Sequence, residues 1–202
     1  MGRAEIAPRC AAGPASYNTA VFRILPALLL LPLSCGGPTA DLRSPDPYER
    51  YLGAKALAQT RDFAALVPLL EDPHVLVVLG ALEAIAAIGE AHALQHVLPR
   101  LAHPHPMVRG QACATIGALG APEGIPPLAG ALRDGDPAVR REAVKALSRF
   151  GDRPEVRAAL LEALSDRDPG VVLMAHEKLS DLTGRQAAVR TREAWEEVLK
   201  RP

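Results

Sequence analysis

The sequence predicts an all-α protein, an α-solenoid built by repeating one helical hairpin. When Val75, Pro106, Pro137 and Pro169 are superposed, the chain matches itself in four successive copies. Within a copy the shared apolar positions lie four, four and three residues apart, which places them on one face of an α-helix. Apolar residues make up 49% of the chain and aromatic residues only 3%, a composition that favours closely packed helices.

Length and charge limit the classes of protein that the sequence can describe. The 202 residues suit one domain and a short extra segment. The chain has 23 basic and 23 acidic residues and a formal net charge of zero. Nucleic-acid binding is therefore not expected, because it depends on an excess of basic side chains.

Residues 1–35 have the pattern of an export signal. Arg23 precedes an apolar run from Ile24 to Leu33, which is too short for a membrane-spanning helix of about 20 residues. Since residues 1–20 make an overlong leader, we expect that translation starts at Val21.

The end of this run, Ser34-Cys35-Gly36, resembles the lipobox of bacterial lipoproteins. That resemblance implies acylation of Cys35 and, because no aspartate follows it, an outer-membrane lipoprotein facing the periplasm of the cell envelope. Pro32 departs from the lipobox pattern, so secretion without a lipid and an uncleaved anchor remain alternatives. Residues 36–43 then form a short linker of about 15 Å.

Cysteine usage agrees with export. Cys10 would be absent or removed and Cys35 would carry the lipid, which leaves Cys113 with no disulfide partner. Cys113 lies at an apolar position of the repeat, so we expect a small buried side chain and not a nucleophile.

Residues 44–184 contain the repeats, the first of them a degraded copy that starts at Asp46-Pro47. Each copy has a first helix whose core positions are valine, alanine and two larger apolar residues. Aspartate followed by proline begins this helix, and glycine ends most copies. A second apolar segment follows, so each unit is a hairpin that only its neighbours can cover. The shared positions are Val77, Val108, Val139 and Val171; Ala81, Ala112, Ala143 and Ala175; Ile85, Ile116, Leu147 and Leu179; and Ile88, Leu119, Phe150 and Leu182.

This pattern resembles the short HEAT-like repeat of the phycobilin lyases. The resemblance covers residues 44–184 and implies a right-handed superhelix of about five hairpins, whose second helices line the concave surface. Arg109 and Arg140 match the arginines that bridge to turn aspartates such as Asp134 and Asp166 in these repeats. We expect these arginines to form surface or inter-repeat pairs, and exposed pairs of this kind contribute only about 0–1 kcal/mol.

Residues 185–202 break the repeat and predict a C-terminal capping helix. Thr191 can cap this helix, and Trp195, Val198 and Leu199 fall on one side of it. The alternative is that Trp195 is exposed and binds a partner.

Histidines are the remaining candidates for chemistry. His92, His96, His103 and His105 lie close in sequence, and metal binding by them is an alternative to ordinary roles in turns and caps. His176-Glu177 resembles the iron-binding pairs of HEAT-like deoxyhypusine hydroxylases, but one pair cannot build a di-iron site. We expect neither a metal nor a cofactor.

The sequence therefore predicts a non-catalytic, membrane-tethered monomer that binds a protein through its concave face. Mixed charges favour a polar protein segment as the ligand. An accessory role in attaching a small molecule to a protein, as in the bilin lyases, remains the alternative. The residues that we expect to contact the partner are Arg157, His96, Gln95, Glu123 and Glu162.

Overall fold

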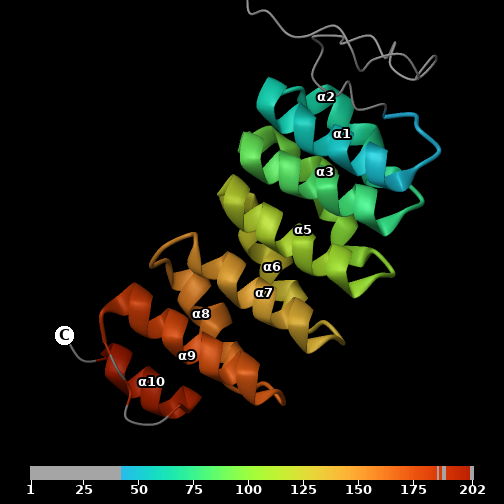
Figure 1. Ribbon diagram of the computed structural model, residues 1–202. Helices are drawn as coiled ribbons and strands as arrows, with labels where there is room; N and C mark the ends of the chain where they lie inside the picture. The colour runs from blue at the N-terminus through green and yellow to red at the C-terminus, as the bar shows by residue number, and fades with distance from the viewer. Residues whose placement is uncertain (1–41, 186, 188–189, 201–202) are drawn as a thin grey trace, which may run out of the picture. The chain divides into compact units, whose positions relative to one another are not determined.

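Five long helices form one layer of the computed structural model, which describes residues 42–185, 187 and 190–200. Figure 1 shows these first helices side by side in chain order. All regular structure in the described residues is helical, which confirms the all-α class, and none of these helices is long and apolar enough to cross a membrane. The first helices are α1 (Pro47–Thr60), α3 (Val75–Ile88), α5 (Pro106–Leu119), α7 (Pro137–Ser148) and α9 (Pro169–Thr183).

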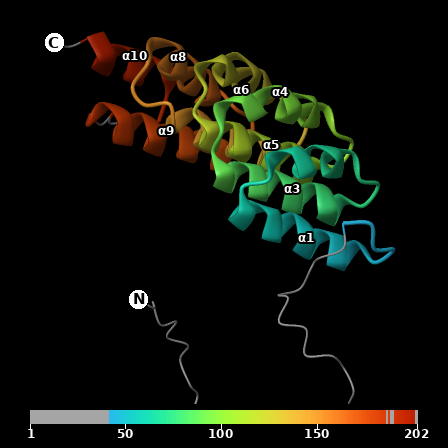
Figure 2. The ribbon, with the colours of Figure 1, turned by 90° about the horizontal axis from the view of Figure 1, so that it is seen from above.

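The second segments form another layer, seen on the other side of the first helices in Figure 2. Most are short and pass into 3₁₀ turns, since prolines such as Pro68 and Pro99 lack the N–H that an α-helix interior requires. These segments are α2 (Phe63–Leu66) with η1 (Val67–Glu71); η2 (Ala91–Ala93), α4 (Leu94–Val97) and η3 (Leu98–Ala102); η4 (Pro122–Gly124) and α6 (Ile125–Ala131); and α8 (Pro154–Ala163). In α8 proline occupies only the first position, so this helix is continuous.

The predicted caps begin and end the first helices. Asp46, Asp136 and Asp168 each accept a hydrogen bond from a backbone N–H of the first turn. A left-handed glycine follows α3, α5 and α9, and in the last case Gly184, at φ +64°, comes one residue after the position that the repeat predicts.

The predicted core positions are buried between the layers and between neighbouring first helices. Every valine and alanine at the shared positions of the four copies is at most 1% exposed. The small side chains let the helices approach closely, most of all where Gly117 of α5 meets Ala146 of α7.

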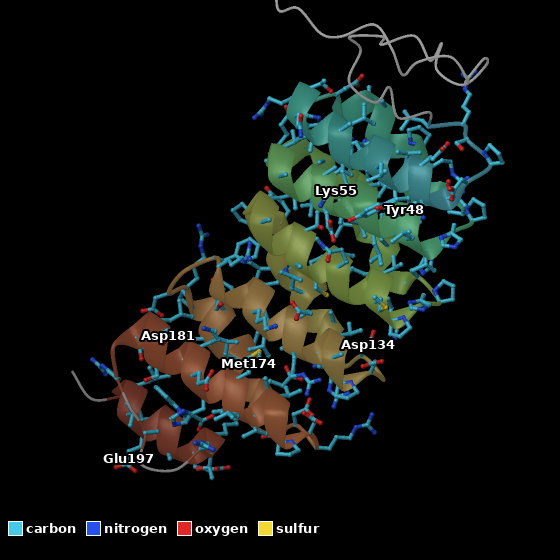
Figure 3. The ribbon with its side chains drawn as sticks, viewed as in Figure 1. Tyr48, Lys55, Asp134, Met174, Asp181 and Glu197 are labelled. Carbon is cyan, nitrogen blue, oxygen red and sulfur yellow. The ribbon has the colours of Figure 1, made fainter. Side chains whose placement is uncertain are left out.

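Arginine–aspartate bridges connect successive turns. Two nitrogens of Arg109 donate to the two carboxylate oxygens of Asp134 at 2.7 and 2.8 Å, and Arg140 bonds Asp166 in the same way. Asp134 lies in the turn before α7, at the edge of the molecule (Figure 3). Arg50 and Asp72 make the equivalent bridge at the start of the stack.

These pairs join successive repeats, which is one of the two forms that the sequence predicts, and they are more buried than the exposed pairs that contribute about 0–1 kcal/mol. The side chains of Arg140 and Asp166 are only 4% and 8% exposed. Hydrogen bonds from Arg109 lower the pKa of Asp134 even though burial opposes the shift. Removing one partner of such a pair leaves a buried charge, which costs about 3–5 kcal/mol.

The C-terminal helix α10 (Arg192–Lys200) packs against α8 in the second layer. Trp195 is fully buried, and its indole ring meets the ring of His176 edge-on with centroids 5.5 Å apart. The alternative of an exposed Trp195 is therefore wrong: this side chain anchors the last helix to the stack.

Two glycines of α5 predict opposite effects of the same substitution. A Cβ atom at Gly117 would lie 2.8 Å from the Ala146 backbone, whereas at Gly110 its nearest neighbour is Glu142 Cγ at 3.6 Å. Gly117→Ala should lower the free energy of unfolding by about 1–3 kcal/mol, because α5 and α7 must separate. Gly110→Ala should raise it by about 0.5–1 kcal/mol through helix propensity. Thermal and denaturant unfolding of both variants measures the difference, and equal effects would contradict the close helix contact.

Candidate functional site

The five residues predicted to contact a partner all lie in the layer of the second segments. Gln95, Glu123 and Glu162 are exposed, and His96 and Arg157 are partly covered. Arg157 pairs with Asp152 at 3.1 Å, and Glu162 pairs with Arg133 at 2.8 Å. None of the five lines a hollow described below, so their role stays a prediction.

Structural roles account for the contacts of the clustered histidines. His103 and His105 each accept a backbone N–H at Nδ1, at 3.0 and 3.3 Å, as turn and cap residues do. The rings of His92 and His96 pack edge-on against Phe63, with centroids 4.8 and 5.5 Å away. Within the described ranges, no three His, Cys, Asp or Glu side chains come together as a metal site would require.

At one junction of the stack, both residues of the arginine–aspartate bridge are replaced, and His103 is one of the two replacements. It occupies the position that Asp134 and Asp166 hold in later turns, while Val78 replaces the arginine that would face it. Burial lowers the pKa of His103, and the nearby positive charges of Arg100, His105 and Arg109 lower it further. A neutral side chain thus replaces the carboxylate where no arginine is available to pair with it.

Cys113 is not placed to act as a nucleophile. It is fully buried in α5, and burial raises the pKa of its thiol to about 12. The thiol is therefore protonated near neutral pH, in agreement with the small buried residue that the repeat predicts.

The outward face of the first helices carries the exposed apolar side chains. The large apolar residues most exposed in the described part of the chain are Tyr48, Leu52, Met107 and Leu173. All four belong to first helices. Figure 3 shows Tyr48, Lys55 and Met174 on this face, which is turned toward the viewer. Exposed apolar residues indicate a binding surface where they are contiguous, and among these four Met107 lines the hollow described next.

A hollow of about 360 Å³ lies on this face across α3, α5 and α7. It arises because α5 carries Gly110 and Ala114 at positions where α3 has Leu79 and Glu83 and α7 has longer side chains. We call this hollow the central notch. Its lining residues are Leu79, Glu83, Pro106, Met107, Gly110, Gln111, Ala114, Asp136, Ala138, Val139 and Glu142.

The rim of the central notch is acidic. Glu83 of α3 and Glu142 of α7 lie on its two sides, and Asp136 lies at the start of α7. Lysines outside the lining neutralise two of these carboxylates. Lys55 binds Glu83 and Lys145 binds Glu142, each with an N–O distance of 2.6 Å. Both pairs are solvent-exposed and therefore easily exchanged.

Two further hollows lie near the second layer. One of about 320 Å³ lies between η3 and α6, and one of about 340 Å³ surrounds the Arg140–Asp166 bridge. The second of these is lined mainly by turn residues that already have structural partners. The exposed apolar residues gather on the opposite layer, so the central notch is the better candidate site.

Sequence reasoning missed the central notch because it treated the first helices only as core. One signal was present: α3 contains a single charged residue, Glu83, and α5 a single one, Arg109. A helix that is apolar on almost every side has a second apolar face besides its core face, and such a face is usually buried against another surface.

A family model and several solved structures match this fold. A family model of HEAT repeats matches residues 39–105 and 94–180. The complex of CpcE and CpcF of phycocyanin lyase from Nostoc sp. PCC7120 is 21% identical with a TM-score of 0.61, over 79% of this chain and 71% of that chain. The E. coli protein YibA is 22% identical with a TM-score of 0.58, over 69% of this chain and 56% of its own.

A designed armadillo repeat protein is 21% identical with a TM-score of 0.51, over 80% of this chain and 90% of that chain. At such identities these likenesses show the fold alone. No curated protein matches the sequence.

The lowered pKa of His103 predicts a loss of stability in mild acid. The folded chain holds its proton less tightly than the unfolded chain, whose histidine titrates near 6.5. Its contribution is fully present above that pH and is lost as the pH falls toward the lower pKa of the folded state. His103→Asn keeps an acceptor for the His105 N–H but does not titrate. Denaturant unfolding between about pH 7 and pH 5 should show a smaller loss in His103→Asn than in the wild type. Equal losses would contradict this role of His103.

Proposed function

Because the chain belongs to the HEAT-repeat family, we propose that it is a non-catalytic scaffold that binds a protein partner through the face of its first helices. The observation that carries this proposal is the central notch, with exposed apolar residues along the same face. A rigid stack presents such a face without reordering, which lowers the entropic cost of binding.

The absence of a catalytic role is also part of the proposal. The thiol of Cys113 is buried and protonated. His176 packs against Trp195, and the histidines of the second and third units bind backbone N–H groups or pack on Phe63. These side chains already have structural partners, which supports a scaffold.

The choice of face differs from the one that the family resemblance implies. The first helices pack against one another along their lengths, whereas the second segments are short and make few contacts with each other. The continuous packing of the first helices and the position of the notch both favour them over the face of Arg157 and His96.

We also propose that a lipid on Cys35 tethers the scaffold to the periplasmic side of the outer membrane. Cys35 and the signal-like segment lie outside the described residues, so the lipobox-like sequence is the support for this part. The described structure begins at Leu42, shortly before the Asp46 cap of α1. A chain of this design would act as a membrane-held adaptor.

An accessory role in attaching a small molecule is the rival function. The fold shared with the complex of phycocyanin lyase subunits is compatible with it. The residues lining the central notch include no aromatic ring, and a flat chromophore would bind poorly without one. Purification of the native protein with a coloured ligand would favour this rival.

Partner capture should depend on the central notch. A photoreactive residue at Gln111 of the full chain should crosslink a protein in membranes, whereas one at Glu123 should not. Gly110→Leu should abolish capture, because its side chain would occupy the notch that Gly110 lines, and thermal unfolding of this variant checks that the fold is intact. Arg157→Glu should leave capture intact. The reverse pattern, loss in Arg157→Glu and retention in Gly110→Leu, would assign binding to the second layer.

Lipidation is tested separately. Metabolic labelling with a fatty-acid analogue should modify the wild-type chain, and Cys35→Ser should remove the label. The variant should also be lost from the membrane fraction, because the acyl chains of the lipid on Cys35 supply the energy that anchors the protein. A label that survives in Cys35→Ser would show that Cys35 is not the modified residue.

A further inference from the structure

We propose that the central notch receives an arginine or lysine side chain from an apolar segment of the partner. This inference rests on the proposed function, since it names the chemistry that the same face recognises. The guanidinium or ammonium group would lie between the rim carboxylates of Glu83 and Glu142, and its aliphatic stem would cover the floor.

The floor of the notch suits an aliphatic stem. Leu79 and Ala114 line it together with Val139, which is itself buried. Met107 is 62% exposed, and its flexible thioether can adapt to the shape of a ligand. Long basic side chains bury their methylene groups on such surfaces while the charged end stays at the rim.

The rim determines the sign of the ligand's charge. Three carboxylates, those of Glu83, Asp136 and Glu142, are among the lining residues, and no lysine or arginine is. Lys55 and Lys145 approach two of them from outside in pairs whose side chains are 36–48% exposed. Such pairs are weak in water, so a cation held on the floor can replace or join them. An anionic side chain would face repulsion there.

Gly110 lines the notch and makes no contact that only glycine allows. A Cβ atom there would meet Glu142 Cγ at an ordinary 3.6 Å, whereas a Cβ atom at Gly117 in the same helix would clash with Ala146. Glycine in a helix interior costs about 0.5–1 kcal/mol relative to alanine. Gly110 therefore lowers helix stability without a close contact that requires glycine, and its lack of a side chain leaves the notch that it lines wider.

The test uses a random-peptide display library, selected on the full-length chain in mild detergent and counter-selected against Gly110→Leu. Peptides that depend on Gly110 should be enriched in arginine or lysine with apolar neighbours. A synthetic peptide from this set should lose affinity when citrulline, the neutral isostere, replaces its arginine.

Variants of the rim then locate the charge. Glu83→Gln and Glu142→Gln should each weaken the arginine peptide about two- to fivefold, the range of an exposed ion pair. Each of these two substitutions should also reduce the difference in affinity between the arginine peptide and the citrulline peptide. Glu177→Gln, at the position of α9 equivalent to Glu83, is the matched control and should change neither. Thermal unfolding of each variant checks that the fold is intact.

The outcomes separate the two proposals. Gly110-dependent peptides without a basic residue, or equal affinities for the arginine and citrulline peptides, would overturn the inference and leave the binding face in place. A selection in which no peptide depends on Gly110 would contradict the proposed function itself.

Discussion

The close approach of neighbouring first helices is the constraint on which the rest of the structure depends. Alanine at positions 81, 112, 143 and 175, and Gly117 against Ala146, keep the helices near enough to exclude water. The same spacing brings each turn within reach of the next, so that Arg109 and Arg140 can bond both oxygens of the following aspartate. Larger residues at these alanine positions would separate the helices and lengthen the distance between each arginine and its aspartate.

Most of the fold could be predicted because the same helix caps and apolar core positions recur in each repeat. The valine and alanine columns, the aspartate caps and the terminal Trp195 helix follow from local patterns that recur or stand out. The second segments were harder, because prolines inside them convert helix into 3₁₀ turns. Their boundaries depend on how each turn packs and not on propensity.

The candidate site was less accessible to sequence reasoning. The central notch exists because two small residues of α5 lie between larger ones of α3 and α7. Such a hollow depends on the side chains of three helices at once, and it becomes visible only when the copies are compared at their outward positions. The burial of the Arg140–Asp166 bridge was missed for a related reason: the bridge joins two repeats, so its exposure depends on how those repeats pack together.

At the junction between α3 and α5, Val78 and His103 stand where other repeats have arginine and aspartate, so this junction has no arginine–aspartate bridge. In the described residues such bridges join the first repeat to the second, the third to the fourth and the fourth to the fifth, but none joins the second to the third. In a linear array, cooperativity is transmitted only through neighbouring interfaces. The junction between α3 and α5 therefore depends on apolar packing and on the buried hydrogen bond that Thr115 Oγ1 donates to the Leu82 carbonyl oxygen. The central notch spans this junction, so a ligand that contacts Glu83 and Glu142 together would act as a splint across it.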